Sequence, residues 1–555
     1  MKNWVSYLLF IGFLGTVVSC GTAKSKKHLP DISAYNATKP VVTKRSDSTF
    51  ISGNNSFSKN KQGLWELYVE GDPLEIGLTT GALSDSLLQK QQRIFFSKIT
   101  DIVPSKFQQK MLRHFLSWFN RKLYLNVPEE YQTEIYGVSQ YTSHEFDNIA
   151  PQYQRGLYLH AAHDIGHALQ DLALVGCSSF AAWNEKSEDG NLILGRNFDF
   201  YVNDAFAENK IIAFVKPKQG HNFMMVTWPG MIGTVSGMNQ QGLTVTINAS
   251  KSKIPLVAKT PISILTREIL QHAQNIDEAI AIAKKRKVFV SESIMVGSAQ
   301  DNKAVLIEVS PKKMDVYDMP NTSQLICSNH FQGEAFKDDK RNQEQIVNSH
   351  SEYRFERIQE LLSENKKINP QIASEILRDK NGLNNLPLGY GNEKALNQLM
   401  AHHGVIFKPK EKLVWVSANP YQLGEFVCYN LDAVFNGKKS NTEISFEQEN
   451  LNIAKDPFIK TEAFQNYKKF KIEDHQMDFY LKKKETISAE FIQNYQSLNP
   501  DYWVVYYKTG LYFYQKKEFQ QAQVNFEKAL TKEITTAPEK AEIEKYLKKL
   551  KRKLQ

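Results

Sequence analysis

The chain has 555 residues, of which 41% are hydrophobic and 23% are charged. These proportions are typical of folded soluble proteins and exclude a globally disordered chain, a collagen and a coiled-coil rod. With 69 Lys and Arg against 60 Asp and Glu, the net charge is +9, which is too mild over this length to indicate a nucleic-acid partner. One apolar stretch is membrane-directed, at the extreme N-terminus, so the pattern excludes a multi-span membrane protein.

The N-terminus has the pattern of a lipoprotein signal. A lysine precedes an apolar run over residues 4–18, which is shorter than the ~20 residues of a spanning helix, and small residues lead into Cys20. We expect residues 1–19 to be a cleaved signal peptide and Cys20 to be lipidated, because several acyl chains give stable anchoring. An ordinary signal peptide followed by a coincidental Cys is the alternative.

This signal predicts an exported bacterial lipoprotein that meets a membrane through its lipid anchor, most simply on the periplasmic side. Residues 20–62 are rich in Ser, Lys, Asn and Thr and show little periodicity, so they are predicted to be the anchor and a flexible tether.

The rest of the chain divides into four predicted parts. Residues 63–176 carry apolar residues at helical spacing and form a predicted helical N-terminal segment. Residues 177–436 contain strand-like runs separated by turn signals, with helical stretches between the hairpins. This order predicts α+β layers of helices and antiparallel sheets. Residues 437–480 are polar and form a predicted connector, and residues 481–555 are predicted to be helical.

The C-terminal helical unit has the spacing of one tetratricopeptide repeat. Small residues where two helices would cross, and aromatic residues between them, are Gly510, Tyr514, Ala522, Phe526 and Ala529. A single repeat forms no solenoid, so we expect this unit to pack on its own chain or to bind a protein partner. A generic helical hairpin with the same spacing is the alternative.

The peptide bond between Gly176 and Cys177 is the candidate for catalytic chemistry. If it breaks, Cys177 carries a thiol and an α-amine on one residue, and an amine of pKa ~7.7–8 can act as general base for its own side chain. Gly176 suits such a scission because it has no side chain and tolerates unusual backbone angles.

Two charged residues lie across a predicted hairpin from Cys177. The polar turn over 184–191 is centred on residue 188, which places Asp199 roughly opposite Cys177, with Arg196 three residues earlier. Residues three apart point to opposite faces of a regular strand, so both reach the site only if the strand bends, bulges or ends there. An exposed Arg–Asp pair of little energetic weight is the alternative.

Four motifs resemble the N-terminal-nucleophile hydrolases, and most closely the isopenicillin-N acyltransferase-like autoproteolytic proteins, the choloylglycine hydrolases and the penicillin V acylases. The resemblance extends over about 177–435. Its motifs are Val-Gly-Cys177-Ser-Ser-Phe, Leu-Gly-Arg196-Asn-Phe-Asp199-Phe, Gly237-Met-Asn-Gln-Gln-Gly242-Leu with Asn248, and Ser328-Asn329-His330-Phe331.

The resemblance implies an αββα sandwich, self-cleavage before Cys177, and cleavage or transfer of an acyl group at an amide. It implies that Cys177 is the nucleophile, flanked by Arg196 and Asp199. Asn248 resembles the side-chain donor to the oxyanion, and Asn329 the residue that positions the amine or substrate. Arg354 resembles the distal Arg of these hydrolases, although Arg357 is equally available. The segment before Cys177 is longer than in choloylglycine hydrolases, so it is either a pro-region or a retained subunit.

A second cluster imitates a zinc site. His160, His163 and His167 are spaced at i, i+3 and i+7, and Asp164 stands where zinc proteases have Glu. The shorter Asp side chain and Gly166 within the helix favour structural histidines, so neither a metal nor another cofactor is expected. Cys327 and Cys428 lie in apolar runs and are expected to be buried thiols, with a mutual disulfide as the alternative.

The sequence thus predicts an amidohydrolase that cleaves a linear N-acyl bond of a small substrate. Water is abundant outside the cytoplasm, which favours hydrolysis over acyl transfer to an amine. A non-enzymatic scaffold that uses the helical repeat is the alternative from another class. Nothing in the sequence distinguishes among a penicillin, an N-acyl amino acid, a bile-acid conjugate and a lipid amide as substrate.

Overall fold

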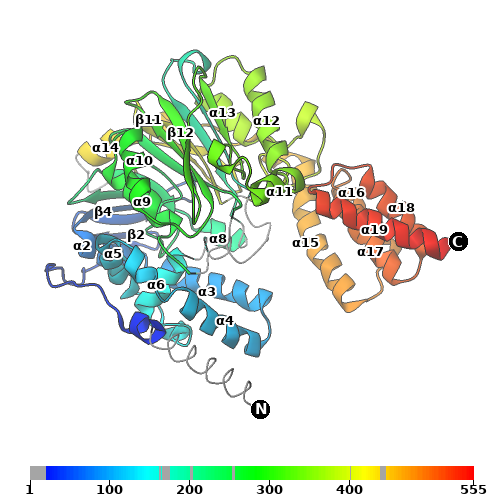
Figure 1. Ribbon diagram of the computed structural model, residues 1–555, viewed down its shortest axis with the longest axis horizontal. Coiled ribbons are helices and arrows are strands. Elements are labelled where there is room, and N and C mark those ends of the chain that lie inside the picture. The colour runs from blue at the N-terminus through cyan, green and yellow to red at the C-terminus, as the bar shows by residue number, and fades with distance from the viewer. Residues whose placement is uncertain are drawn as a thin grey trace.

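A computed structural model describes residues 21–161, 164, 176–200, 204–252, 257–400, 402–437 and 445–555 (Figure 1). The expected signal peptide and Cys20 lie outside these residues. No helix in the described part of the chain is both long and apolar enough to cross a membrane.

The strands are Thr43–Ser46 (β1), Thr49–Ser52 (β2), Asn55–Lys59 (β3), Trp65–Gly71 (β4), Ser178–Ala182 (β5), Ile193–Phe198 (β6), Ile211–Pro217 (β7), Phe223–Thr227 (β8), Ser236–Asn239 (β9), Leu243–Ala249 (β10), Glu292–Ser298 (β11), Lys303–Val309 (β12), Met314–Tyr317 (β13), Gln324–Cys327 (β14), His403–Lys408 (β15), Leu413–Ser417 (β16) and Phe426–Asn430 (β17).

The α-helices are Pro73–Leu83 (α2), Asp85–Ile102 (α3), Lys106–Phe119 (α4), Glu129–Ser139 (α5), Gln152–His160 (α6), Asp204–Glu208 (α8), Ile262–His272 (α9), Ile276–Lys285 (α10), Lys340–Asn348 (α11), Ser351–Glu364 (α12), Pro370–Leu377 (α13), Leu431–Asn436 (α14), Glu462–Lys483 (α15), Ala489–Leu498 (α16), Trp503–Gln515 (α17), Phe519–Leu530 (α18) and Ala537–Leu554 (α19).

Two sheets face each other at the centre of the molecule. An eleven-stranded sheet has the order β1-β2-β3-β4-β7-β8-β9-β10-β11-β12-β13, and a six-stranded sheet has the order β14-β5-β6-β15-β16-β17. Side chains such as Leu194 and Met224 fill the space between the sheets. Helices α9 and α10 cover the outer face of the larger sheet, and α12 and α13 cover the smaller one. The predicted α+β fold with antiparallel sheets is confirmed, and the layers follow the αββα order (Figure 1).

The N-terminal region differs from its prediction. Residues 43–59, expected within a tether, form β1, β2 and β3 at the edge of the larger sheet. Residues 65–71, expected within a helical segment, form β4, which pairs in parallel with β7 from Trp65↔Ile211 to Gly71↔Pro217. For residues 43–59 the prediction was wrong because β1–β3 are short and polar, so strand pairing rather than hydrophobic alternation identifies them.

The helices expected before Cys177 are present and pack closely. Helices α2 and α5 cross at two glycines, Gly77 and Gly137. A Cβ at Gly137 would lie 2.6 Å from the backbone nitrogen of Leu78, which real side chains do not tolerate. The crossing therefore depends on the missing side chains.

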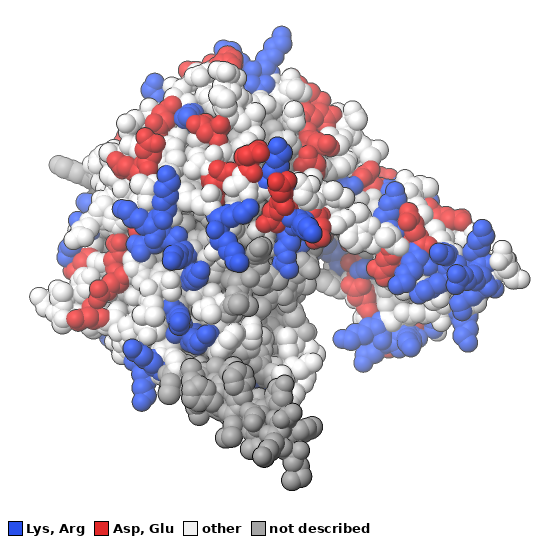
Figure 2. Space-filling view, in the orientation of Figure 1, with Lys and Arg blue, Asp and Glu red and all other residues white. Residues whose placement is uncertain are grey.

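The C-terminal helical unit begins earlier than predicted. Helix α15 starts at Glu462, within the expected connector, and shares one apolar core with α16–α19. At the crossing of α17 and α18, a Cβ on Gly510 would lie 2.8 Å from the Phe526 ring, as the repeat spacing predicts. Lys and Arg side chains gather on this lobe, over α19 among others (Figure 2). Identity with a tetratricopeptide repeat stays a prediction.

Cys327 and Cys428 are buried free thiols, and no disulfide joins the cysteines of the described residues. The predicted thiols are confirmed, and the mutual disulfide is excluded.

Candidate active site

The hairpin of β5 and β6 places Cys177 beside Arg196. Its register pairs Ser178 with Asn197 and Ser179 with Arg196, so Cys177 falls opposite Phe198, one residue from the predicted position. Gly176 is the residue opposite Asp199, and its N–H donates to the Asp199 carbonyl over 3.2 Å. Strand β6 ends at Phe198, so Asp199 leaves the regular alternation of faces. One of the three conditions that the sequence required, an end of the strand, is thus met.

Arg196 is buried and held on several sides. Its Nη2 lies 3.6 Å from the Cys177 Sγ and also donates to the Ile247 carbonyl. Its Nη1 donates to the Val235 carbonyl over 3.1 Å and to the Ser236 hydroxyl. The guanidinium lies 4.3 Å from the centroid of the Phe198 ring. These contacts fix a positive charge next to the sulfur.

Asp199 is a buried carboxyl group close to Cys177. Among the described residues, neither carboxyl oxygen has a hydrogen-bond partner with acceptable geometry. Burial raises the pKa of Asp199 to about 7, while the nearby guanidinium groups of Arg354 and Arg196 and the Gln422 amide lower it. A carboxyl group that titrates near neutral pH can take up a proton from a neighbour and return it.

The Cys177 thiol is itself 1% exposed. Burial raises its pKa to about 11, and the charge of Arg196 opposes this rise. In the intact chain the thiol is therefore protonated at neutral pH, and attack by the sulfur requires a base.

Arg354 joins the predicted site residues around the Gly176–Cys177 peptide. Its Nη1 donates to the Gly176 carbonyl over 3.0 Å, to the Cys177 carbonyl over 2.7 Å and to the Ser178 hydroxyl over 2.7 Å. Its Nη2 donates to the Asn329 Oδ1 over 2.6 Å. The alternative, Arg357, instead pairs with Asp379 at 2.9 Å and with Glu360 at 2.8 Å.

Asn329 and Asn248 have different positions. The Asn329 amide bridges Arg354 to the Ala249 carbonyl, to which its Nδ2 donates over 2.8 Å. Asn248 accepts from the Ser179 hydroxyl over 2.8 Å, and its Nδ2 donates to the Cys327 carbonyl over 3.3 Å. Its amide is thus bonded to Ser179 and Cys327 and makes no hydrogen bond to Gly176 in the intact chain.

Gln398 is a site residue that the sequence analysis missed. It is 1% exposed, and its Nε2 donates to the Gly176 carbonyl over 3.0 Å, on the same oxygen as Arg354. No motif marks it, because it lies in the loop between α13 and β15 and reaches the site only through the fold.

Two members of the histidine cluster, His160 and Asp164, are engaged by backbone groups. The Ile232 N–H donates to the His160 Nε2 over 2.9 Å, so the proton lies on Nδ1, which donates to the Gly156 carbonyl over 2.7 Å. The Asp164 carboxylate accepts from the Ile262 N–H at the start of α9. His163 and His167 lie outside the described residues, and the described residues contain no group of ligands suited to a metal.

Comparison with known proteins agrees with the resemblance. Residues 183–419 match the family model of acyl-coenzyme A:6-aminopenicillanic acid acyl-transferase. The match begins after Cys177 and includes the positions of Arg196, Asp199, Arg354 and Gln398. The predicted resemblance to this family is confirmed over these residues, and the matched model is that of an acyl-transferase.

Curated relatives are distant. An uncharacterized protein of Archaeoglobus fulgidus is 25% identical over 275 residues, which cover 46% of this chain and 45% of that protein. Protein dcd1B of Dictyostelium discoideum is 24% identical over 267 residues, covering 45% and 51%. The chain spans about half the length of the curated relatives it matches.

Solved structures with similarity include a Caenorhabditis elegans ortholog of N-acylethanolamine-hydrolyzing acid amidase, with 18% identity, a TM-score of 0.31, and coverage of 42% of this chain and 93% of that one. A variant of conjugated bile acid hydrolase from Clostridium perfringens has 13% identity, a TM-score of 0.33, and coverage of 48% and 95%.

Proposed function

We propose that this protein cleaves its own Gly176–Cys177 bond and then acts as an amidohydrolase with Cys177 as nucleophile. The observation that carries the proposal is the environment of that peptide. Its carbonyl oxygen accepts from Arg354, while the Cys177 sulfur lies beside Arg196 and near a carboxyl group, Asp199, that titrates near neutral pH.

Self-cleavage follows from these positions in two steps. The Cys177 thiol transfers its proton to the Asp199 carboxylate, and the sulfur forms a bond to the Gly176 carbonyl carbon. The C–N bond then breaks, the proton passes to the Cys177 nitrogen, and a thioester remains. Water hydrolyses the thioester to a Gly176 carboxylate and a free thiol, so one water molecule is consumed.

The mature site uses the new α-amine. Its reference pKa of ~7.7–8 suits a general base for the Cys177 thiol, which the peptide nitrogen of the intact chain cannot be. The sulfur attacks the carbonyl of a small N-acyl substrate, the amine leaves with a proton, and water releases the acid. Asp199 lies where it can hold the amine, and Arg354 and Asn329 lie where they can position the substrate.

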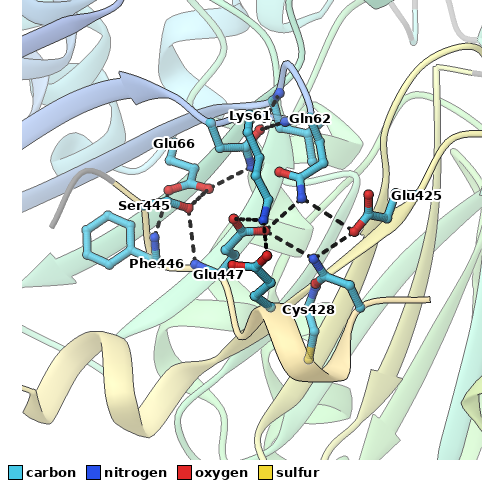
Figure 3. Close-up of polar contacts among 12 residues, drawn as sticks. Lys61, Gln62, Glu66, Glu425, Cys428, Ser445, Phe446 and Glu447 are labelled. Carbon is cyan, nitrogen blue, oxygen red and sulfur yellow. Dashed lines mark hydrogen bonds and ion pairs between the residues drawn. The ribbon is translucent and has the colours of Figure 1, made fainter. Parts of the chain in front are cut away.

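We propose that the segment before Cys177 stays bound after cleavage. Its β4 strand pairs with β7 inside the larger sheet, and Glu66 of β4 is buried. The Glu66 carboxylate accepts from the Ser445 hydroxyl over 2.8 Å and from the Phe446 N–H over 2.9 Å (Figure 3). It also accepts from the Tyr429 hydroxyl over 3.0 Å. Nearby, Gln62 donates to Glu447 over 2.8 Å. Cleavage leaves these contacts intact.

Hydrolysis is the proposed reaction, and acyl transfer is the second candidate because the matched family model is that of an acyltransferase. Product analysis with and without an added primary amine separates them. Hydrolysis yields only the free acid in both cases, whereas transfer yields a new amide when the amine is present.

Export and lipidation at Cys20 remain part of the proposal, which rests on the N-terminal signal pattern. Metabolic labelling with a radioactive fatty acid should label the wild-type chain but not the Cys20→Ala variant. Labelling of both would place the lipid elsewhere.

Intact-mass analysis and N-terminal sequencing test the core of the proposal. The purified protein should contain a fragment that starts with Cys-Ser-Ser-Phe, and Cys177→Ala should remain uncut and should not hydrolyse N-acyl compounds. A Cys177→Ala protein that still cleaves such compounds would overturn the mechanism. The buried free thiol Cys428 provides the matched control, since Cys428→Ala should be processed.

A further inference from the structure

We propose that Gln398 is a catalytic residue of self-cleavage, the second donor that stabilises the oxyanion formed on Gly176. This inference rests on the proposed function, because it assigns a role in the scission of the Gly176–Cys177 bond. The partner donor is Arg354, and the two side chains approach the same carbonyl oxygen from different elements.

The Gly176 carbonyl oxygen has two side-chain donors. Gln398 Nε2 and Arg354 Nη1 each lie 3.0 Å from the Gly176 carbonyl oxygen, and both residues are buried. When the sulfur attacks, this oxygen gains a negative charge. Preorganised donors in a water-excluded site stabilise such a charge far more than they stabilise the starting carbonyl.

The position of Gln398 also explains why residue 176 is a glycine. A Cβ at this position would lie 3.0 Å from the Gln398 Cδ and closer still to its amide atoms. Any other residue would therefore displace the Gln398 amide from the carbonyl. The glycine before the scissile bond is thus explained by the approach of this glutamine, and not only by backbone freedom.

The loop that carries Gln398 is held by hydrogen bonds from two other elements. Asn197 Nδ2 donates to the Leu396 carbonyl over 3.0 Å, and Tyr467 of α15 donates to the Leu399 carbonyl over 3.2 Å. Leu399 has φ of 53°, a left-handed conformation that is costly for a leucine. The fold therefore maintains a strained residue directly after Gln398, which is expected where backbone geometry serves a site.

The test follows the conversion of precursor to fragments by intact mass over time. Gln398→Met keeps the side-chain length but has no donor, and we expect cleavage to slow roughly 100- to 1,000-fold. Gln398→Glu should be slower still, because a carboxylate would place negative charge against the developing oxyanion. A purely structural role would not produce this order. Gln154→Met, which removes a buried amide that donates to the Ser25 and His28 carbonyls, is the matched control and should be cleaved at the wild-type rate.

A double variant sharpens the test. Gly176→Ala should slow cleavage by displacing Gln398, and its combination with Gln398→Met should cost much less than the product of the two single effects. Cleavage of a folded Gln398→Met protein at the wild-type rate would overturn the inference while leaving the proposed function intact. A wild-type protein that never cleaves would instead overturn the proposed function. Circular dichroism of each precursor reports whether it is folded.

Discussion

The two regions outside the matched residues 183–419 join the sandwich in different ways. The N-terminal segment contributes backbone hydrogen bonds, because β4 continues the larger sheet through β7. The C-terminal unit has its own apolar core, into which Leu399 and Leu423 pack. It also meets the sandwich through polar contacts: the Tyr390 N–H donates to the Asn499 Oδ1 over 3.0 Å, and Lys471 pairs with Asp204 at 2.5 Å. The peptide bond that is proposed to break thus joins the sandwich to the N-terminal segment, the region that shares a sheet with it.

This difference has a consequence for the site. The N-terminal segment ends in Gly176, whose carbonyl is the reacting group, and the C-terminal unit supports the loop that carries Gln398. The N-terminal segment therefore supplies the carbonyl of the scissile bond, and the C-terminal unit supports the loop of Gln398, a hydrogen-bond donor to that carbonyl. The N-terminal segment is therefore expected to matter more for self-cleavage than the C-terminal unit.

The largest effect is expected from omitting residues 21–176. A chain of residues 177–555 should not fold, because β7 would become an exposed edge whose side chains are buried in the intact protein. Expression should give insoluble protein, measured as the soluble fraction after lysis. Co-expression of residues 21–176 as a separate chain should restore solubility. A soluble 177–555 chain with native circular dichroism would contradict the view that the segment is integrated.

The next effect is the pH dependence of self-cleavage. The pKa of Asp199 is about 7, and only the carboxylate form accepts the thiol proton. The rate should therefore rise about tenfold per pH unit below pH 7 and level off above it. Asp199→Asn should be slow at every pH. Glu308→Gln is the matched control, because burial also raises the pKa of Glu308 to about 7 but its carboxylate binds the backbone at Gln332 and Gly333.

Part of this site was predictable from the sequence and part was not. The centre of the turn over 184–191 predicts the residue opposite Cys177 to within one position, because turn residues and strand runs are encoded locally. Strands β1–β3 could not be predicted, because they are short and polar and are recognised only by their pairing with neighbouring strands. Gln398 reaches the site from a loop, and Asn248 of β10 bonds to residues of β5 and β14 in the other sheet. No spacing in the sequence encodes such long-range contacts.

A third prediction concerns how the segment stays bound. Burial raises the pKa of Glu66 from 4.5 in the unfolded chain to about 7 in the fold. Between these values the folded protein binds more protons than the unfolded chain, so this residue's contribution to stability falls as pH rises from 4.5 to 7. The loss is on the order of 3 kcal/mol.

Glu66→Gln should remove this loss because the amide is neutral at every pH. The free energy of unfolding, measured with urea at pH 5 and pH 8, should fall less for Glu66→Gln than for wild type. The exposed Glu145→Gln protein should behave as wild type does. Equal pH dependence in Glu66→Gln and wild type would exclude Glu66 as the titrating group.

The smallest effect is expected at the C-terminal unit. Tyr467→Phe removes the hydrogen bond to the Leu399 carbonyl but keeps the ring in the apolar core, and a neutral hydrogen bond contributes about 1 kcal/mol. We expect self-cleavage to slow by a few fold, because the loop that carries Gln398 gains freedom. Tyr495→Phe loses a stronger, charge-assisted hydrogen bond to Asp474 within the unit and should still leave the rate unchanged. Equal rates in Tyr467→Phe and wild type would show that the hydrogen bond from Tyr467 to Leu399 is not needed to hold Gln398 at Gly176. Bonds within the sandwich, such as those from Asn197 to the Leu396 carbonyl and from the Asn397 N–H to the Asp379 carbonyl, would then suffice.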